Sequence, residues 1–168
     1  AASLGYSAAW IVPTYKHVKT LDRLCAEAVK TVQPKNLIMF EPIFRYRFPN
    51  KGNINLFSAD DYNSMCGSSY DVIFVDSPGE MPKDVFYEHF LPMIAEGGVM
   101  YLCGAPPEGE HWFKDALNKN YRDEKSWHRP SSLNPDPQVQ KWIRFAKRNL
   151  PASVYRHRVL AEFAEDKS

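Results

Sequence analysis

Three short apolar runs constrain the fold of this chain most strongly. They are residues 8–12 (AAWIV), 70–76 (YDVIFVD) and 97–104 (GGVMYLCG). Between them, apolar residues recur at helical spacing over residues 18–29, and a second helical stretch covers residues 83–95. Strands that alternate with helices are typical of a mostly parallel sheet with helices on its faces. We therefore predict a three-layer α/β fold in which residues 8–12 form a central strand.

Further segments complete the predicted fold. Residues 37–40, 44–48 and 54–57 are short β-rich runs, and the turn-forming sequence PNKGN between the last two predicts a hairpin. Near the C-terminus, an apolar stripe from Val139 to Leu150, which includes Trp142, predicts one helix. A second helix is predicted after Pro151, with Tyr155, Val159 and Phe163 buried. We expect one partial domain: an α/β core over residues 1–135 and a helical C-terminal segment over residues 136–168.

Composition excludes several classes of protein. The net charge is +1, so no global field draws the chain to nucleic acid or membrane, and such contacts require a local patch. Cys25, Cys66 and Cys103 lie far apart without a Cys-x-x-Cys spacing, which argues against a disulfide framework and a zinc site. No run approaches the roughly 18 apolar residues of a membrane span. We expect a soluble, intracellular protein.

Asp76 is the first candidate for chemistry because it ends an apolar strand. Ligands of parallel sheets lie at the carboxyl ends of the strands, and many nucleoside triphosphatases place a magnesium-holding aspartate there. Taken alone, the strand favours a simpler interpretation, in which Asp76 caps the next turn. The wider sequence context shifts that balance.

Several segments, in order, resemble the ATPase domain of the large terminase subunits of tailed bacteriophages, which pump DNA into capsids. The matching segments are WIVPTY (10–15), FPNKGNI with FSAD (48–60), Gly67 with YDVIFVD (70–76), GAPPEG with WF (104–113), NP (134–135) and LAEF (160–163).

The resemblance implies a P-loop NTPase fold of the ASCE class and a motor that couples ATP hydrolysis to translocation of double-stranded DNA. The implied cofactors are ATP and Mg²⁺. The implied partners are double-stranded DNA, the portal protein and the small terminase subunit, in the host cytoplasm. Asp76 corresponds to the magnesium-holding Walker B aspartate. Gly104, Ala105 and Pro106 correspond to the coupling motif that senses the γ-phosphate.

The chain also departs from the family pattern. Walker A, Gly-x-x-x-x-Gly-Lys-Ser/Thr, is absent, and the family order places it before Ala1, so we expect a sheet that is incomplete at its N-terminal side. Ser77 replaces the usual water-orienting glutamate. Glu80 substitutes for it if the Pro78-Gly79 turn returns its carboxylate toward the metal. Ala105 replaces a hydroxyl residue, and the nuclease domain is missing. We expect no ATP turnover by the chain alone.

Two other functions stay open. A non-catalytic terminase-like or helicase-like binding module is favoured by Ser77 and Ala105, because truncation does not explain substitutions inside the core. A helicase fragment of the same ASCE class is the third possibility.

The remaining predictions concern surfaces. Lys141, Arg144 and Arg148 form a basic helix side, extended by Arg156, that is suited to DNA phosphates, although a solvated face also explains it. A sheet that lacks a strand exposes an apolar edge, so we expect self-association. The histidines at positions 89, 111, 128 and 157 lack metal-ligand spacing.

Overall fold

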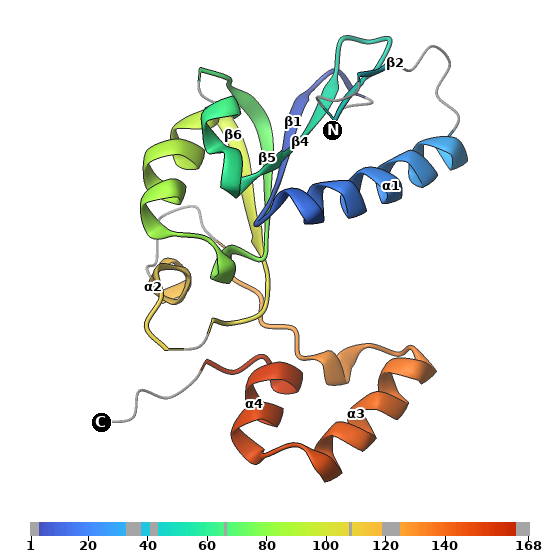
Figure 1. The fold of residues 1–168 in the computed structure, drawn as a ribbon, viewed down its shortest axis with the longest axis vertical. Coiled ribbons are helices and arrows are strands. Elements are labelled where there is room, and N and C mark those ends of the chain that lie inside the picture. The colour runs from blue at the N-terminus through green and yellow to red at the C-terminus, as the bar shows by residue number, and fades with distance from the viewer. Residues whose placement is uncertain are drawn as a thin grey trace. The chain divides into compact units, whose positions relative to one another are not determined.

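The computed structural model describes residues 4–32, 38–40, 44–65, 67–107, 109–118 and 125–163. The chain divides into two compact units, Ala1–Gly104 and Ala105–Ser168, each of which is described by itself (Figure 1). That the two units make up one partial domain, with a core over residues 1–135, stays a prediction.

A six-stranded sheet forms the centre of the first unit, with the strand order β2-β3-β4-β1-β5-β6. The parallel pairs are β1 with β4, β1 with β5, and β5 with β6, whereas β3 pairs antiparallel with β2 and β4. The predicted α/β sheet and the central position of β1 are confirmed. The bounds are β1 (Ser7–Val12), β2 (Ile38–Phe40), β3 (Arg45–Arg47), β4 (Asn53–Ser58), β5 (Tyr70–Asp76) and β6 (Ile94–Cys103).

The hairpin between β3 and β4 forms where the turn sequence predicts it. Tyr46 is opposite Ile54 in the antiparallel register. The turn closes through a 2.8 Å hydrogen bond from the Phe48 amide to the Gly52 carbonyl. Lys51 has a positive φ of 69°, which fits a tight turn. The predicted strand residue 37 lies outside the described residues.

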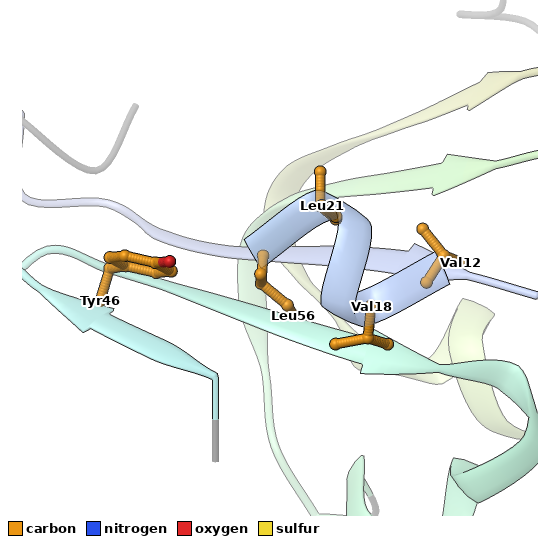
Figure 2. Close-up of a cluster of buried hydrophobic side chains, with 5 residues drawn as sticks. All are labelled: Val12, Val18, Leu21, Tyr46 and Leu56. Atoms are coloured by element: carbon orange, nitrogen blue, oxygen red, sulfur yellow. The ribbon is translucent and has the colours of Figure 1, made fainter. Parts of the chain in front are cut away.

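Helix α1 (Tyr15–Val32) covers one face of the sheet over β1 and β4. Figure 2 shows the buried side chains that it shares with these strands and with β3. Burial of each large apolar side chain contributes about 1.5–3 kcal/mol. Pro34, the predicted stop of this helix, lies outside the described residues. The cluster consists of Val12, Val18, Leu21, Tyr46 and Leu56.

The helical turns η4 (Val85–Phe90) and η5 (Leu91–Met93) lie on the other side of the strands from α1 (Figure 1). Two more turns, η2 (Ala59–Met65) and η3 (Pro78–Glu80), follow the carboxyl ends of β4 and β5. The predicted helix over 83–95 is too long at its end, because the backbone of Ile94 is extended and pairs with Tyr70. Strand pairing therefore begins β6 three residues before the predicted position 97.

Three aromatic side chains form a row over the neighbouring strands β1, β5 and β6, on the face of the sheet that α1 covers only in part. The Trp10 and Phe74 ring centroids are 5.6 Å apart, and those of Phe74 and Tyr101 are 5.0 Å apart. Phe74 is 37% exposed, Tyr101 44% and Val99 47%. Since β6 is the last strand of the described sheet, this apolar surface continues to a sheet edge.

The second unit is helical. Helix α3 begins after Asp136, whose carboxylate accepts hydrogen bonds from the amides of Gln138 and Val139 at 2.7 and 3.3 Å. Ile143 and Ala146 of α3 pack with Val159 of α4, so the predicted C-terminal helices are confirmed. The elements are α2 (Trp112–Asn118), η6 (Ser131–Leu133), α3 (Pro137–Asn149) and α4 (Ala152–Leu160).

Two details of the predicted C-terminal helices differ from the structure. Trp142, predicted for the apolar stripe, is largely exposed. Phe163 follows the end of α4. Within the described parts of the chain, no helix is both long and apolar enough to cross a bilayer.

Candidate functional site

Asp76 lies at the carboxyl edge of the sheet, where β1, β5 and β6 end together. Val75 is opposite Ile11 of β1, and Asp76 is opposite Cys103 of β6. All three strands run parallel, so their carboxyl ends meet on one edge. This is the position at which open α/β sheets bind ligands.

The chain turns sharply directly after Asp76. Ser77 adopts the left-handed conformation, with φ 56° and ψ 51°, which is uncommon for a residue with a side chain. One 3₁₀ turn, Pro78–Glu80, follows, and the Glu80 amide donates to the Ser77 carbonyl at 2.9 Å. Met81 is buried and anchors the end of the turn. The turn thereby reverses the chain within three residues.

The turn brings Glu80 to the same pocket as Asp76. The pocket has a volume of about 160 Å³, and Ser77 lies between the two acidic residues in its wall. Glu80 therefore lines the same pocket as Asp76, and its role as the substitute for the water-orienting glutamate stays a prediction. The other lining residues come from the end of β1 and from α1: Val12, Pro13, His17, Thr20, Leu21 and Leu24.

His17 and Thr20 of α1 were not among the predicted site residues. The Thr14 hydroxyl lies 3.2 Å from Nδ1 of His17, a hydrogen bond that fixes the ring near the N-terminus of the helix. The signal for both residues was their helical spacing with Leu21 and Leu24, which places them on one helix face. That face was interpreted as core, but at its N-terminal end it also lines the pocket.

Gly104, directly after β6, packs closely against the turn that follows Asp76. The Ser77 amide donates to the Cys103 carbonyl at 2.8 Å, which joins the ends of β5 and β6. A Cβ atom at Gly104 would lie 2.8 Å from Pro78 Cδ and 3.0 Å from Ser77 Cα. Only glycine fits this approach. Ala105 and Pro106, the other predicted coupling residues, open the second unit, where Ala105 is exposed and Pro106 is buried.

Comparison with solved structures identifies this architecture. The large terminase ATPase domain of Thermus phage P74-26 matches with a TM-score of 0.67 and 19% identity, over 95% of this chain and 77% of that chain. The large terminase of another thermophilic bacteriophage matches with a TM-score of 0.70 and 17% identity, over 94% of this chain and 40% of that chain. The chain has the fold of a phage large terminase ATPase domain.

The chain spans only part of the matched terminases. Its match covers 39% of the thermophilic phage chain that was solved with ATP-γ-S. A scan of family models gave no match, and a search of curated proteins gave none either. The fold is thus established by structure, at sequence identities of 14–20%.

The acidic residues of the terminase-fold pocket fit one mode of magnesium binding. Within the described ranges, no group of three or more His, Cys, Asp or Glu side chains is placed to hold a metal ion. Mg²⁺ is usually held by one or two carboxylates together with waters and substrate phosphates, and Asp76 with Glu80 suits that mode. The sequence contains no Walker A pattern, so these residues provide no cradle for the β- and γ-phosphates.

The predicted DNA-binding residues lie on α3 of the second unit. Lys141, Arg144 and Arg148 are all exposed, on helix positions other than those of the buried Ile143 and Ala146. Arg156 of α4, which the basic side was expected to include, instead forms an ion pair with Glu162 at 2.5 Å. The basic surface suited to phosphates is therefore centred on α3, and its role stays a prediction.

Proposed function

We propose that this chain is part of a DNA-packaging motor ATPase of the large-terminase type, which couples ATP hydrolysis to translocation of double-stranded DNA in the host cytoplasm. The terminase fold supports this proposal. The observation that carries it is the pocket at the carboxyl edge of the sheet, which Asp76 and Glu80 line together. Two carboxylates in one pocket suit the binding of Mg²⁺, the ion that phosphoryl transfer uses to neutralise developing charge.

Each acidic residue has a distinct proposed role. Asp76 is the last residue of β5 and holds Mg²⁺ beside the phosphates. Glu80 lies at the end of the turn and accepts the proton of the attacking water, the role that Ser77 cannot fill. Gly104, Ala105 and Pro106 respond to the γ-phosphate and pass its loss on to the DNA-gripping surface.

The remaining parts of the motor come from elsewhere. The phosphate cradle is absent from this sequence, so we propose that a separate segment supplies it and that the chain alone does not hydrolyse ATP. The large terminase of the thermophilic bacteriophage has been solved with ADP and with ATP-γ-S, which supports a nucleotide as the ligand of this fold. Lys141, Arg144 and Arg148 contact DNA phosphates, and the portal protein and small terminase subunit are the proposed protein partners.

A non-catalytic binding module is the second candidate function. Two substitutions favour it: Ser77 at the position of the water-orienting glutamate and Ala105 in the coupling segment. In this candidate the sheet is kept for docking to a partner.

Magnesium-dependent binding of a fluorescent ATP analogue separates the two candidates. The wild-type chain is compared with Asp76→Ala and with Asp84→Ala, a control that removes an exposed carboxylate outside the pocket. Because the phosphate cradle is absent, the motor proposal expects only weak binding by this chain, which requires Mg²⁺, is lost in Asp76→Ala and is retained in Asp84→Ala. Equal signals from all three proteins, with or without Mg²⁺, would favour the binding module.

A further inference from the structure

A second pocket lies at the opposite edge of the same sheet, where β1 and β5 begin. Its volume is about 230 Å³, and every residue that lines it carries a polar group. Two of them are arginines and none is acidic. Since β5 separates this pocket from Asp76 by roughly 20 Å, it is distinct from the candidate nucleotide site. The lining consists of Ser7, Arg45, Arg47, Asn53, Asn55, Ser68, Ser69 and Tyr70.

The sheet register explains why these side chains meet. Arg45 is opposite Asn55 and Arg47 is opposite Asn53 in the β3–β4 hairpin, and Ser7 of β1 is opposite Asn53. Side chains two residues apart on a strand point to the same face, so these five residues share one face. It is the face opposite the α1 core, because Tyr46, between the two arginines, is buried against α1.

Two successive hydrogen bonds orient Arg45. Its Nε donates to Oδ1 of Asn55 at 2.8 Å, and Nδ2 of Asn55 donates to the Tyr70 hydroxyl at 2.7 Å. Asn55 is 5% exposed and Tyr70 is 3% exposed, so the bond between them is shielded from water, whereas the bond from Arg45 is partly buried. The bond through Nε fixes the plane of the guanidinium, and the two terminal nitrogens take no part in it.

The carboxylate of Asp71 contacts Ser7, but Asp71 is not among the residues that line the pocket. Its Oδ2 accepts hydrogen bonds from the Ser7 amide at 2.7 Å and from the Ser7 hydroxyl at 3.0 Å. Asp71 therefore positions Ser7, and the residues that line the pocket include Arg45 and Arg47 but no acidic residue.

We propose that this pocket binds a phosphate group. A planar guanidinium matches the geometry of phosphate oxygens with two parallel hydrogen bonds, and serine and asparagine side chains supply the additional donors that such sites use. Ser68 and Ser69 bring two of these donors from the loop before β5. The phosphate belongs either to a nucleic-acid backbone or to a free phosphate ion. The site does not depend on the proposed ATPase function.

Backbone amide NMR shifts during titration with inorganic phosphate, at constant ionic strength, test the proposal. We expect saturable shifts at Ser7, Asn53, Ser68 and Ser69 in the wild-type chain below about 10 mM phosphate. The double variant Arg45→Gln/Arg47→Gln should lose these shifts, and Arg23→Gln, an exposed arginine on α1, should keep them. Arg45→Lys keeps the positive charge but loses the two parallel N–H donors of the guanidinium, so the variant should bind phosphate about tenfold more weakly.

A short DNA duplex in the same titration identifies the source of the phosphate. Displacement of phosphate by DNA at the same amides assigns the site to a nucleic-acid backbone, and phosphate binding without DNA binding assigns it to free phosphate. The proposal is overturned if wild-type shifts at these amides do not saturate, or if Arg23→Gln abolishes them as fully as the double variant. If the double variant fails to fold, the wild-type titration decides by itself: saturable shifts at these amides support the site, and shifts that do not saturate overturn it.

Discussion

The backbone amide of Ser77 donates a 2.8 Å hydrogen bond to the carbonyl of Cys103, which fastens the end of β5 to the end of β6. This bond fixes the position of Ser77, the residue after which the 3₁₀ turn Pro78–Glu80 begins. That turn places Glu80 in the same pocket as Asp76. The geometry of the candidate site thus depends on a strand end that contributes no side chain to it. Gly104, next to Cys103, allows the close approach.

Gly104→Ala should lower the free energy of unfolding by about 1–3 kcal/mol, the usual cost of overpacking. The added methyl would lie 2.8 Å from Pro78 Cδ, and the Ser77 backbone leaves little room for it to shift. Urea denaturation measures the loss. In a Pro78→Ala background, which removes Cδ, the same substitution should cost less. Equal costs in both backgrounds would show that the Pro78 ring does not limit the space at Gly104.

Ser77→Gly should raise the free energy of unfolding by about 0.5–1 kcal/mol, because the left-handed conformation strains any residue with a Cβ atom. The φ of 56° at Ser77 is the basis of this expectation. Ser77→Val should have the opposite sign, since β-branched residues tolerate this conformation least. Thermal denaturation of the three proteins ranks them, and a glycine variant less stable than the valine variant would refute the strained turn.

Cys25 should react with iodoacetamide more slowly than Cys103. Burial, reinforced by the negative charge of Asp22, raises the pKa of the Cys25 thiol above its usual value. The thiolate is the reactive form, so a raised pKa leaves less of it at any pH below that pKa, and labelling should accelerate only in more alkaline solution. Cys103 is exposed. Site-resolved mass spectrometry at about pH 8 and about pH 10, on either side of the usual thiol pKa, measures both rates.

Two further results would complete the test at Cys25. Asp22→Asn should speed Cys25 labelling only modestly, because burial is the larger cause of the raised pKa. Faster labelling of Cys25 than of Cys103 at the lower pH would contradict the described packing of α1.

The exposed edge of β6 should cause self-association. Phe74, Val99 and Tyr101 form an apolar surface that continues to a strand with no neighbour on its outer side among the described strands. Elution volume in size-exclusion chromatography should decrease as the protein concentration rises. Tyr101→Lys should weaken this dependence, whereas Leu133→Lys, at an exposed apolar position in the second unit, should not. A monomer at every concentration would count against an open edge.

Much of the fold follows from local patterns. The apolar run that ends in Asp76 predicts β5 correctly because its central residues, from Val72 to Val75, are all apolar and the strand buries Ile73 and Val75 on one face. The end of the helix before β6 was wrong, since Ile94 leaves the helix to pair with Tyr70, a contact between residues far apart in the sequence. Local propensity contains no information about such pairing.

The candidate sites depend on geometry that the sequence alone does not specify. The position of Glu80 follows from one left-handed residue, Ser77, which no propensity predicts for serine. The phosphate pocket depends on the hairpin register, because a shift by one residue would turn Arg45 and Arg47 to the α1 face. His17 was overlooked because its helix face also contains core residues.

The most direct test of the account is paramagnetic broadening of backbone amide signals by Mn²⁺ in the presence of ATP. Mn²⁺ shares the oxygen ligands of Mg²⁺. The account predicts that the Ser77 and Glu80 signals broaden first, that ATP strengthens the effect, and that Asp76→Ala removes it while Asp84→Ala does not. Broadening spread evenly over exposed carboxylates such as Asp60 and Glu88, and unchanged in Asp76→Ala, would contradict a metal–nucleotide site at this edge of the sheet.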